Sequence, residues 1–237
     1  MIYGAVLAGG VGSRMKMADR PKQFLELGDR PIIIHTVEKF ITNRRFDKIY
    51  VAIHKDWNGY LTDLLLKYGV TDPRVSVVDG GNDRNETIMN VIHDIEKAGP
   101  LNQDDIIVTH DAVRPFLTAR IIDENIDGAL KYGMCDTALA ATDTIVCSEN
   151  NQYITDIPNR AAMYQGQTPQ SFNILKLKTL YESLTPQQKN ILTDACKICT
   201  LAGEKVYLVE GDVYNVKITT AGDYKIACAI LEVGAGD

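Results

Sequence analysis

The sequence predicts an α/β protein: a Rossmann-like, mostly parallel twisted sheet with helices on both faces and a protruding β-hairpin arm. Short apolar, β-branched runs alternate with amphipathic stretches along most of the 237 residues, and repeated strand–helix–strand units of this kind build parallel sheets. Several runs are apolar without alternation, which is typical of strands buried on both faces. The alternation stops between about residues 142 and 170, where the chain is predicted to leave the sheet.

The first half of the chain predicts strands and helices in alternation. Strands are expected at Ile2–Leu7, Lys48–Ile53, Val75–Val78 and Asp105–Thr109. Helices are expected at Pro31–Ile41, Trp57–Tyr68, Glu86–Ala98 and Ala119–Tyr132, where apolar residues recur at helical spacing. Ligands of such sheets bind outside the carboxyl ends of the strands, so we look for chemistry in the residues that follow each strand.

The second half begins with the arm, where the β-branched runs Thr144–Cys147 and Tyr153–Ile157 flank a polar turn. An isolated hairpin is only marginally stable in water, so we expect the arm to lean on a second subunit. The chain then predicts, in order, a helix within Leu175–Leu184, a Thr185 N-cap with Pro186 at N1, strands at Val206–Glu210 and Val216–Thr219, and a helix at Ala221–Val233. We expect one domain over residues 1–237, with the arm (residues 142–166) inserted in it.

Composition excludes several classes of protein. The 25 basic and 31 acidic residues give a net charge of −6, which disfavours a nucleic-acid binder because such binding rests on a basic surface. No apolar stretch approaches the roughly 18 residues of a membrane span. The first residues lack the basic start of a signal peptide, and the odd count of five cysteines does not suggest a disulfide framework. We therefore expect a cytoplasmic protein. Cys196-x-x-Cys199 has metal-ligand spacing, but no second pair accompanies it, so ordinary packed cysteines are the simpler interpretation.

The first candidate site follows the first strand, at Leu7-Ala8-Gly9-Gly10-Val11-Gly12-Ser13-Arg14-Met15. Glycines let the backbone approach an anion closely and point its amides at it. The segment fails as a dinucleotide fingerprint because it ends in Met15, and it fails as a Walker A loop because no Gly-Lys-Ser/Thr follows. Four cations within nine residues instead suggest a polyphosphate site: Arg14, Lys16, Arg20 and Lys22. A solvated turn before a helix is the alternative.

Two further candidate sites follow the third and fourth strands. The first contains Gly80, Gly81, Asn82, Asp83, Arg84, Asn85, Glu86 and Thr87, a set suited to reading a base or ribose, although a capped strand-to-helix turn explains it as well. The second is His110-Asp111-Ala112-Val113-Arg114-Pro115. Asp111 is well placed to approach a Mg²⁺–nucleotide complex, and His110 is expected to be a packed or hydrogen-bonded neighbour.

Two later cations complete the set of phosphate-binding candidates. Arg160 follows the arm's second run, and Lys217 stands in a short apolar run, where lysine is unusual without an anionic partner, unless it snorkels to the surface. The sequence shows no Ser-His-Asp arrangement, paired carboxylates or histidine-rich metal cluster. Positioning and charge neutralisation, as in phosphoryl-type transfer, fit Arg14, Lys22, Arg160 and Lys217 best.

Taken together, these motifs resemble the sugar-alcohol-phosphate cytidylyltransferases, over nearly the whole chain and in order. The resemblance is carried by Leu7-Ala8-Gly9-Gly10-x-Gly12-x-Arg14-Met15, Pro21-Lys22-Gln23-Phe24-Leu25-x-Leu27, His110-Asp111-x-x-Arg114-Pro115, Gln167-Thr168-Pro169-Gln170 and Val216-Lys217-Ile218-Thr219. The family includes enzymes that act on 2-C-methyl-D-erythritol 4-phosphate, in isoprenoid synthesis, and on D-ribitol 5-phosphate, in teichoic acid synthesis for the cell wall. Pro158-Asn159-Arg160 leading to Tyr164–Gln170 looks closer to the ribitol branch, whereas Ala112 is expected in the isoprenoid branch.

The resemblance implies roles for the candidate residues. CTP would lie over Leu7, Ala8, Gly9 and Gly10 and over the Gly80–Glu86 loop, with Thr87 nearby. Arg14 and Lys22 would hold the triphosphate, while Arg160 and Lys217 would hold the acceptor phosphate for in-line attack. Mg²⁺ would bind near Asp111, and the arm would cross to a partner in a homodimer. We expect CDP-ribitol and pyrophosphate as products. The alternatives are methylerythritol phosphate as the acceptor, a nucleotide binder without turnover, and, more weakly, a nicotinamide oxidoreductase.

Overall fold

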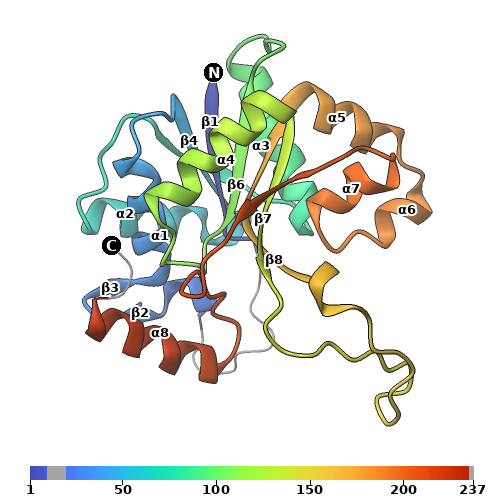
Figure 1. The fold of residues 1–237 in the computed structure, drawn as a ribbon. Coiled ribbons are helices and arrows are strands. Elements are labelled where there is room, and N and C mark those ends of the chain that lie inside the picture. The colour runs from blue at the N-terminus through green and yellow to red at the C-terminus, as the bar shows by residue number, and fades with distance from the viewer. Residues whose placement is uncertain (10–19, 235–237) are drawn as a thin grey trace.

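The computed structural model describes residues 1–9 and 20–234, and they are organised around one seven-stranded sheet (Figure 1). Its strands are β1 (Ile2–Leu7), β4 (Lys48–Ile53), β5 (Val75–Asp79), β6 (Ile106–Asp111), β7 (Met134–Ala140), β8 (Tyr164–Asn173) and β9 (Tyr207–Glu210). The order is β5-β4-β1-β6-β8-β7-β9. Strand β8 runs antiparallel to both of its neighbours, and every other pairing is parallel. The predicted fold class, a mostly parallel Rossmann-like sheet, is confirmed.

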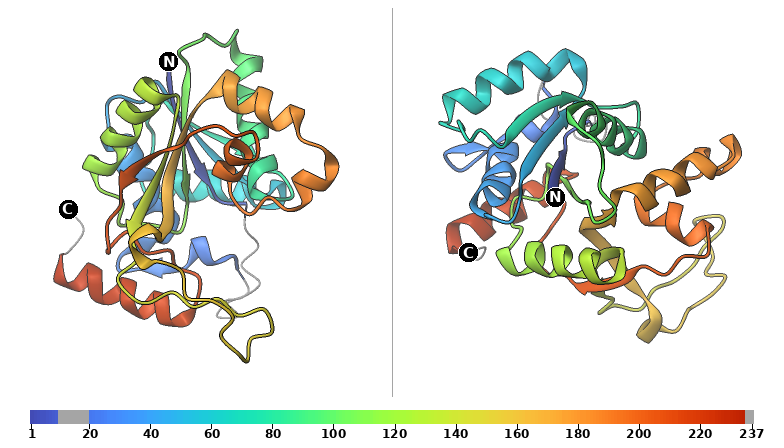
Figure 2. Two further views of the ribbon diagram at one scale, coloured as in Figure 1. Left: turned by 45° about the vertical axis from the view of Figure 1, so that its right-hand side comes forward. Right: turned by 90° about the horizontal axis from the view of Figure 1, so that it is seen from above.

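Helices cover both faces of the sheet, as Figure 2 shows. They are α1 (Ile32–Thr42), α2 (Asn58–Lys67), α3 (Arg84–Ala98), α4 (Ala119–Tyr132), α5 (Ile174–Ser183), α6 (Pro186–Asn190), α7 (Ala195–Leu201) and α8 (Ala221–Val233). One buried cluster joins β1, β4 and β6 to α1, α2 and α4, and a second joins the opposite face to α3, α5 and α7. Successive side chains of a strand point to opposite faces, so the continuous apolar runs of β1 and β4 contribute to both clusters.

A third, smaller layer closes the carboxyl end of the sheet. It comprises α8 and the two-stranded β2 (Glu26–Leu27) and β3 (Arg30–Pro31), packed through Leu27, Ile218 and Ile230. Short 3₁₀ turns η1 (Lys22–Phe24), η2 (Lys55–Trp57) and η3 (Arg160–Ala162) complete the elements. This layer places Lys217 and Ile218 beside the end of β6, which positions the site described below.

Local chemistry explains where the helices begin and end. Side chains of Asp83, Thr118 and Thr220 accept hydrogen bonds from the first-turn amides of α3, α4 and α8. Gly133 ends α4 with a φ of 82°, which glycine adopts without steric cost. The predicted Thr185–Pro186 start of α6 is confirmed, and it forms a full capping box.

Three expectations about secondary structure need correction. Val216–Thr219 is no strand: Ile218 makes one backbone hydrogen bond, to Val113, and packs its side chain into the third layer. Strands β7 and β8 were not predicted, because buried polar side chains and Pro169 interrupt their apolar pattern. Helix α7 was also missed, since it is only seven residues long.

The arm protrudes from the body, at the yellow end of β8 in Figure 1. Instead of two regular strands, its predicted runs share one antiparallel bridge, between Cys147 and Asp156. Neither run packs against the rest of the described chain, so pairing gains little there. The arm exposes the large apolar side chains of Val146, Tyr153, Ile154, Ile157 and Tyr164. No helix among the described residues is long and apolar enough to cross a membrane.

Candidate active site

A cavity of about 520 Å³ opens at the carboxyl ends of β1, β4, β5 and β6. Segments that follow these strands supply most of its wall, together with η1 and the segment before α8. The lining residues are Leu7, Ala8, Gly9, Lys22, Gln23, His54, Gly81, Asn82, Asp83, Arg84, Thr87, Asp111, Ala112, Val113, Lys217 and Thr219. The edge of the sheet at which we expected chemistry therefore carries the cavity.

Most of the predicted site residues line this cavity, and a few do not. Gly80, Asn85, Glu86 and Arg160 lie outside the lining, while Gly10 and Arg14 lie outside the described residues. Sequence reasoning quoted Gln23, Ala112, Val113 and Thr219 within motifs but gave them no role in the site, and it did not select His54. His54 directly follows β4, so the rule of looking after each strand could have found it.

The loop after β5 is held in shape by the first turn of α3. The Thr87 hydroxyl donates to the Asp83 carbonyl at 2.7 Å and accepts from the Gly81 amide at 3.0 Å, while the Asn82 amide donates to the Glu86 carboxylate at 2.8 Å. A Cβ on Gly81 would come within 2.5 Å of the Glu86 side chain, so this close approach requires glycine. Glu86 thus supports the loop from outside the cavity.

The turn η1 is tied to the end of β1. The Gln23 amide nitrogen donates to the Ala8 carbonyl at 2.7 Å, and Gln23 itself is buried. This bond places Lys22 at the cavity beside Gly9.

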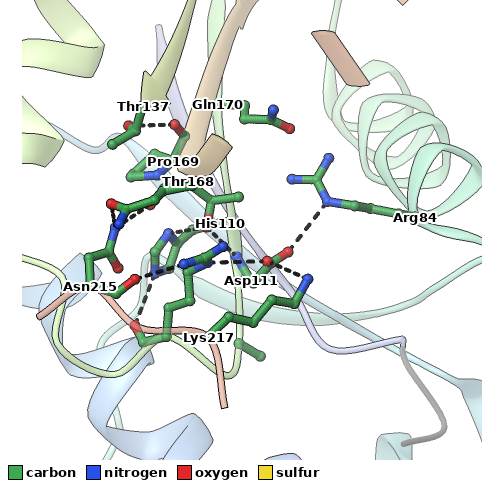
Figure 3. Close-up of polar contacts among 12 residues, drawn as sticks. Arg84, His110, Asp111, Thr137, Thr168, Pro169, Gln170, Asn215 and Lys217 are labelled. Carbon is green, nitrogen blue, oxygen red and sulfur yellow. Dashed lines mark hydrogen bonds and ion pairs between the residues drawn. The ribbon is translucent and has the colours of Figure 1, made fainter. Parts of the chain in front are cut away.

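Asp111, at the tip of β6, is a buried carboxylate surrounded by three cations (Figure 3). Its Oδ2 lies 2.9 Å from Lys217 Nζ and 3.4 Å from Arg114 Nε, and its Oδ1 lies 3.4 Å from Arg84 Nε. Burial alone would raise the pKa of Asp111, but the charges of Arg84, Lys217 and Arg114 hold it well below its ordinary range. Asp111 is therefore an anion at neutral pH.

The tip of β6 and the segment carrying Lys217 are both fastened to Gln167-Thr168-Pro169-Gln170. The Thr168 hydroxyl lies 2.8 Å from His110 Nδ1 and accepts from the Asp111 amide at 3.2 Å. Asn215 donates to the Thr168 carbonyl at 2.8 Å and to Gln167 Oε1 at 3.1 Å (Figure 3). The polar residues that hid β8 from prediction thus build the floor of the site.

His110 is fully buried and hydrogen-bonded, as expected. Its Nε2 lies 3.1 Å from the Arg114 carbonyl. Burial lowers the pKa of His110 to about 4 despite the nearby Asp111 charge, so the imidazole is neutral at neutral pH. Its role is to orient Thr168 and the turn that carries Arg114.

Arg160 lies away from the cavity, at the base of the arm. It is exposed, and its Nη1 donates to the Thr142 carbonyl at 2.9 Å. Within one chain, the structure therefore does not bring Arg160 to Lys217.

The described residues do not fit the expected magnesium site at Asp111. Both Asp111 oxygens are engaged by cations, whereas Mg²⁺ prefers oxygen ligands without competing positive charge. The other carboxylate in the cavity lining, Asp83, uses its Oδ1 to cap α3. Cys199 is buried and belongs to no group of potential metal ligands among the described residues.

Chemically, the cavity suits a polyphosphate anion. Glycine backbone from Gly9 and Gly81 and the cationic residues Lys22, Arg84 and Lys217 line the same space. Fixed cations of this kind stabilise charge that develops on transferring phosphoryl groups.

Comparisons with known proteins identify a matching family and similar folds. The family model of 2-C-methyl-D-erythritol 4-phosphate cytidylyltransferase (IspD) matches residues 2–233. The fold is similar to 4-diphosphocytidyl-2C-methyl-D-erythritol synthase from Anaerococcus prevotii DSM 20548, with 27% identity, a TM-score of 0.79, and 98% of this chain and 96% of that chain covered. It is also similar to the 2-C-methyl-D-erythritol 4-phosphate cytidylyltransferase of Francisella tularensis, with 27% identity, a TM-score of 0.77, and coverage of 95% and 97%. The enzyme of that name from Thermus thermophilus, 23% identical, shares the fold with a TM-score of 0.72 over 98% of this chain and all of its own.

Proposed function

The chain belongs to the IspD family of cytidylyltransferases, which are nucleotidyltransferases, and from that premise we propose that it transfers the cytidylyl group of CTP to 2-C-methyl-D-erythritol 4-phosphate. The observation that carries the choice of acceptor is the family match over residues 2–233. Two similar structures with 27% identity bear the names of enzymes for that compound. Pyrophosphate would be the second product.

The geometry supports in-line attack by the acceptor phosphate on the α-phosphorus of CTP. The nucleotide would lie over Leu7–Gly9 and the Gly80–Thr87 loop, with Lys22 and Arg14 stabilising charge on the phosphates. Lys217, whose ammonium group is fixed by Asp111, would hold the acceptor phosphate in the same cavity. Cations are needed for both substrates because two phosphate anions must approach each other.

A homodimer through the arm is part of this proposal. Arg160 lies outside the cavity of its own chain, at the base of an arm that exposes several large apolar side chains. Burying those side chains against a second subunit would remove them from water. Arg160 would then reach the acceptor phosphate in the cavity of the second subunit.

D-Ribitol 5-phosphate, the acceptor that the sequence motifs favoured, is the second candidate. The observation behind it is the run from Pro158-Asn159-Arg160 to Tyr164–Gln170, which resembles the ribitol branch. The family match and the similar structures support methylerythritol phosphate better, so the expectation of a teichoic acid precursor enzyme takes second place.

Pyrophosphate release from the purified chain tests the proposal. The protein is incubated with CTP and Mg²⁺, in parallel with methylerythritol phosphate and with ribitol 5-phosphate, while release is followed by a coupled phosphate assay. Release with methylerythritol phosphate alone supports the first acceptor, and release with ribitol 5-phosphate alone replaces it by the second. CTP binding without pyrophosphate release with either acceptor would refute both candidate functions and favour a nucleotide binder without turnover.

Magnesium stays a prediction. Because Asp111 and Asp83 do not fit a metal held by the protein, we expect the ion to enter as a complex with the nucleotide. When CTP is titrated into the protein in a calorimeter, it should bind more tightly with Mg²⁺ present than with EDTA present. Titration of Mg²⁺ into the protein without nucleotide should give no binding heat.

A further inference from the structure

Gln170 hydrogen-bonds to a pair of half-buried acids and lies near the guanidinium of Arg84 (Figure 3). Its Nε2 donates to Asp194 Oδ2 at 2.7 Å and to Asp136 Oδ1 at 3.0 Å, and it lies 3.3 Å from Cys196 Sγ. Gln170 is completely buried on β8, and its Oε1 has no hydrogen-bonding partner within the described part of the protein. The amide thus turns its positive end to the acids and leaves its negative end unused.

The unused end faces the side on which Arg84 lies. In Figure 3 the guanidinium of Arg84 lies between Asp111 and Gln170. Only its Nε is paired, with Asp111, and both terminal nitrogens are buried without a partner among the described residues. Buried guanidinium nitrogens without a hydrogen-bonding partner are costly, so the Arg84 side chain is attracted to nearby carboxylates. Asp136 is a nearby carboxylate: burial raises its pKa, while the hydrogen bond from Gln170 and the charge of Arg84 lower it.

We propose that Gln170 is a positioning residue which, by keeping Arg84 away from Asp136 and Asp194, holds Arg84 on Asp111 and so leaves Lys217 available to an acceptor phosphate. Asp111 shares its charge among Arg84, Arg114 and Lys217. If Arg84 turned to Asp136 and Asp194, Asp111 would interact more strongly with Lys217. Lys217 would then bind a second anion, the acceptor phosphate, less tightly. This inference rests on the proposed function through Lys217 alone.

Replacing Gln170 by methionine tests the inference, since methionine keeps the length and removes the amide. We expect Gln170→Met to raise the acceptor KM about fivefold to tenfold, a range typical of coupled neighbours. The KM for CTP should change less than the acceptor KM. The assays are run at about pH 8, because burial, with Asp194 beside it, raises the pKa of Asp136 to about 6 and the acid must be ionised.

A rescue distinguishes positioning from simple loss of packing. Asp136→Asn removes one of the anions that attract Arg84, so the double variant Gln170→Met/Asp136→Asn should recover most of the lost acceptor affinity. Ser171→Ala is the matched control: Ser171 is the next residue on β8 and equally buried, but it bonds Asn125 on the opposite face. Ser171→Ala should lower thermal stability without changing the acceptor KM.

Calorimetric binding of inorganic phosphate supplies a readout that needs no turnover. Gln170→Met should weaken phosphate binding, and adding Asp136→Asn should restore it. An unchanged acceptor KM and phosphate affinity in Gln170→Met, or no recovery in the double variant, would overturn the inference. Absence of turnover in the wild-type protein with either acceptor would overturn the proposed function instead, while the phosphate measurement still decides the role of Gln170. If Gln170→Met does not fold, Asp136→Asn alone decides: phosphate affinity equal to or above wild type supports the inference, and weaker affinity refutes it.

Discussion

Replacing Asp111 by asparagine removes the one anion among Arg84, Arg114 and Lys217 while keeping the shape of the side chain. In the native protein its carboxylate lies within 3.4 Å of a nitrogen of each cation. The pKa of Asp111 is held below its ordinary range, so its stabilising effect is fully present above the pKa of the unfolded chain. That effect is lost only as pH falls through the lower folded-state value, so neutral pH measures all of it.

The expected loss of stability follows from the burial of the partners. Removing one member of a buried ion pair costs about 3–5 kcal/mol, because the other charge stays buried without compensation. Arg114 is 10% exposed and cannot escape, whereas Lys217 is 40% exposed and can turn to water. We therefore expect about 3 kcal/mol, the lower end of that range. For a chain of this length this corresponds to a fall of about 6–12 °C in melting temperature.

Thermal unfolding followed by circular dichroism at neutral pH measures this loss. Asp79→Asn is the control, because Asp79 is an exposed aspartate at the end of β5 that accepts one hydrogen bond, from Asn58. The control should change stability by less than about 0.5 kcal/mol. If Asp111→Asn melted within a degree or two of the wild type, the three cations would not depend on the carboxylate, and the electrostatic account of this site would be refuted.

The remaining predictions concern turnover and pH. Lys22→Ala should reduce the rate of pyrophosphate release by about two orders of magnitude, the scale for the loss of one cation that stabilises the transition state. We expect the same of Arg14→Ala, a residue assigned from the sequence motif alone. A normal rate in either variant would contradict the role of that residue at the triphosphate. Lys217→Ala should raise the KM for the acceptor more than the KM for CTP, and an unchanged acceptor dependence would contradict its role. Burial lowers the pKa of His110 to about 4 and raises that of Asp136 to about 6. As pH drops from about 6 to 4, protonation of His110 in the unfolded chain lowers the free energy of unfolding, whereas protonation of Asp136 in the folded protein raises it. Asp136→Asn removes the second effect, so its free energy of unfolding, measured by urea titration, should fall more steeply with decreasing pH. An unchanged dependence on pH would contradict the raised pKa of Asp136.

The fold could be predicted where apolar patterning decides the structure. The boundaries of β1 and β4 were predicted without error, and those of α3 and β6 within two residues. The three strands contain short, continuous apolar runs buried on both faces, and α3 has apolar residues at helical spacing. Strand β8 could not be predicted this way. Its Thr168, Gln170 and Ser171 are buried and polar, and each forms a hydrogen bond with a side chain from another element. Such partners are known only once the fold is known.

The site could be predicted in part, for a related reason. Residues that directly follow strands, such as Gly9, Gly81 and Asp111, could be located because strand ends meet at one edge of the sheet. The arrangement of Arg84, Gln170 and Asp136 could not, since it depends on side chains from α3, β8 and β7 that are far apart in the sequence. Lys217 was singled out because a lysine in an apolar run needs an anion, and Asp111 is that anion.

The reversed direction of β8 bears on the order in which the protein folds. Because β8 enters the sheet between β6 and β7, the floor of the cavity joins His110 to Thr168, and Arg114 to Asn215 across 101 positions of chain. Contacts so distant in sequence form slowly, after closure of long loops. A chain still being synthesised can pair β1 with β4 and β6 early, but it leaves the β8 edge of β6 unpaired until nearly three quarters of the sequence has emerged. During that interval the open edge of β6 is the place where the growing chain is most exposed to misassembly, and substitutions that slow the arrival of β8 should lower folding yield before they lower the activity of the folded enzyme.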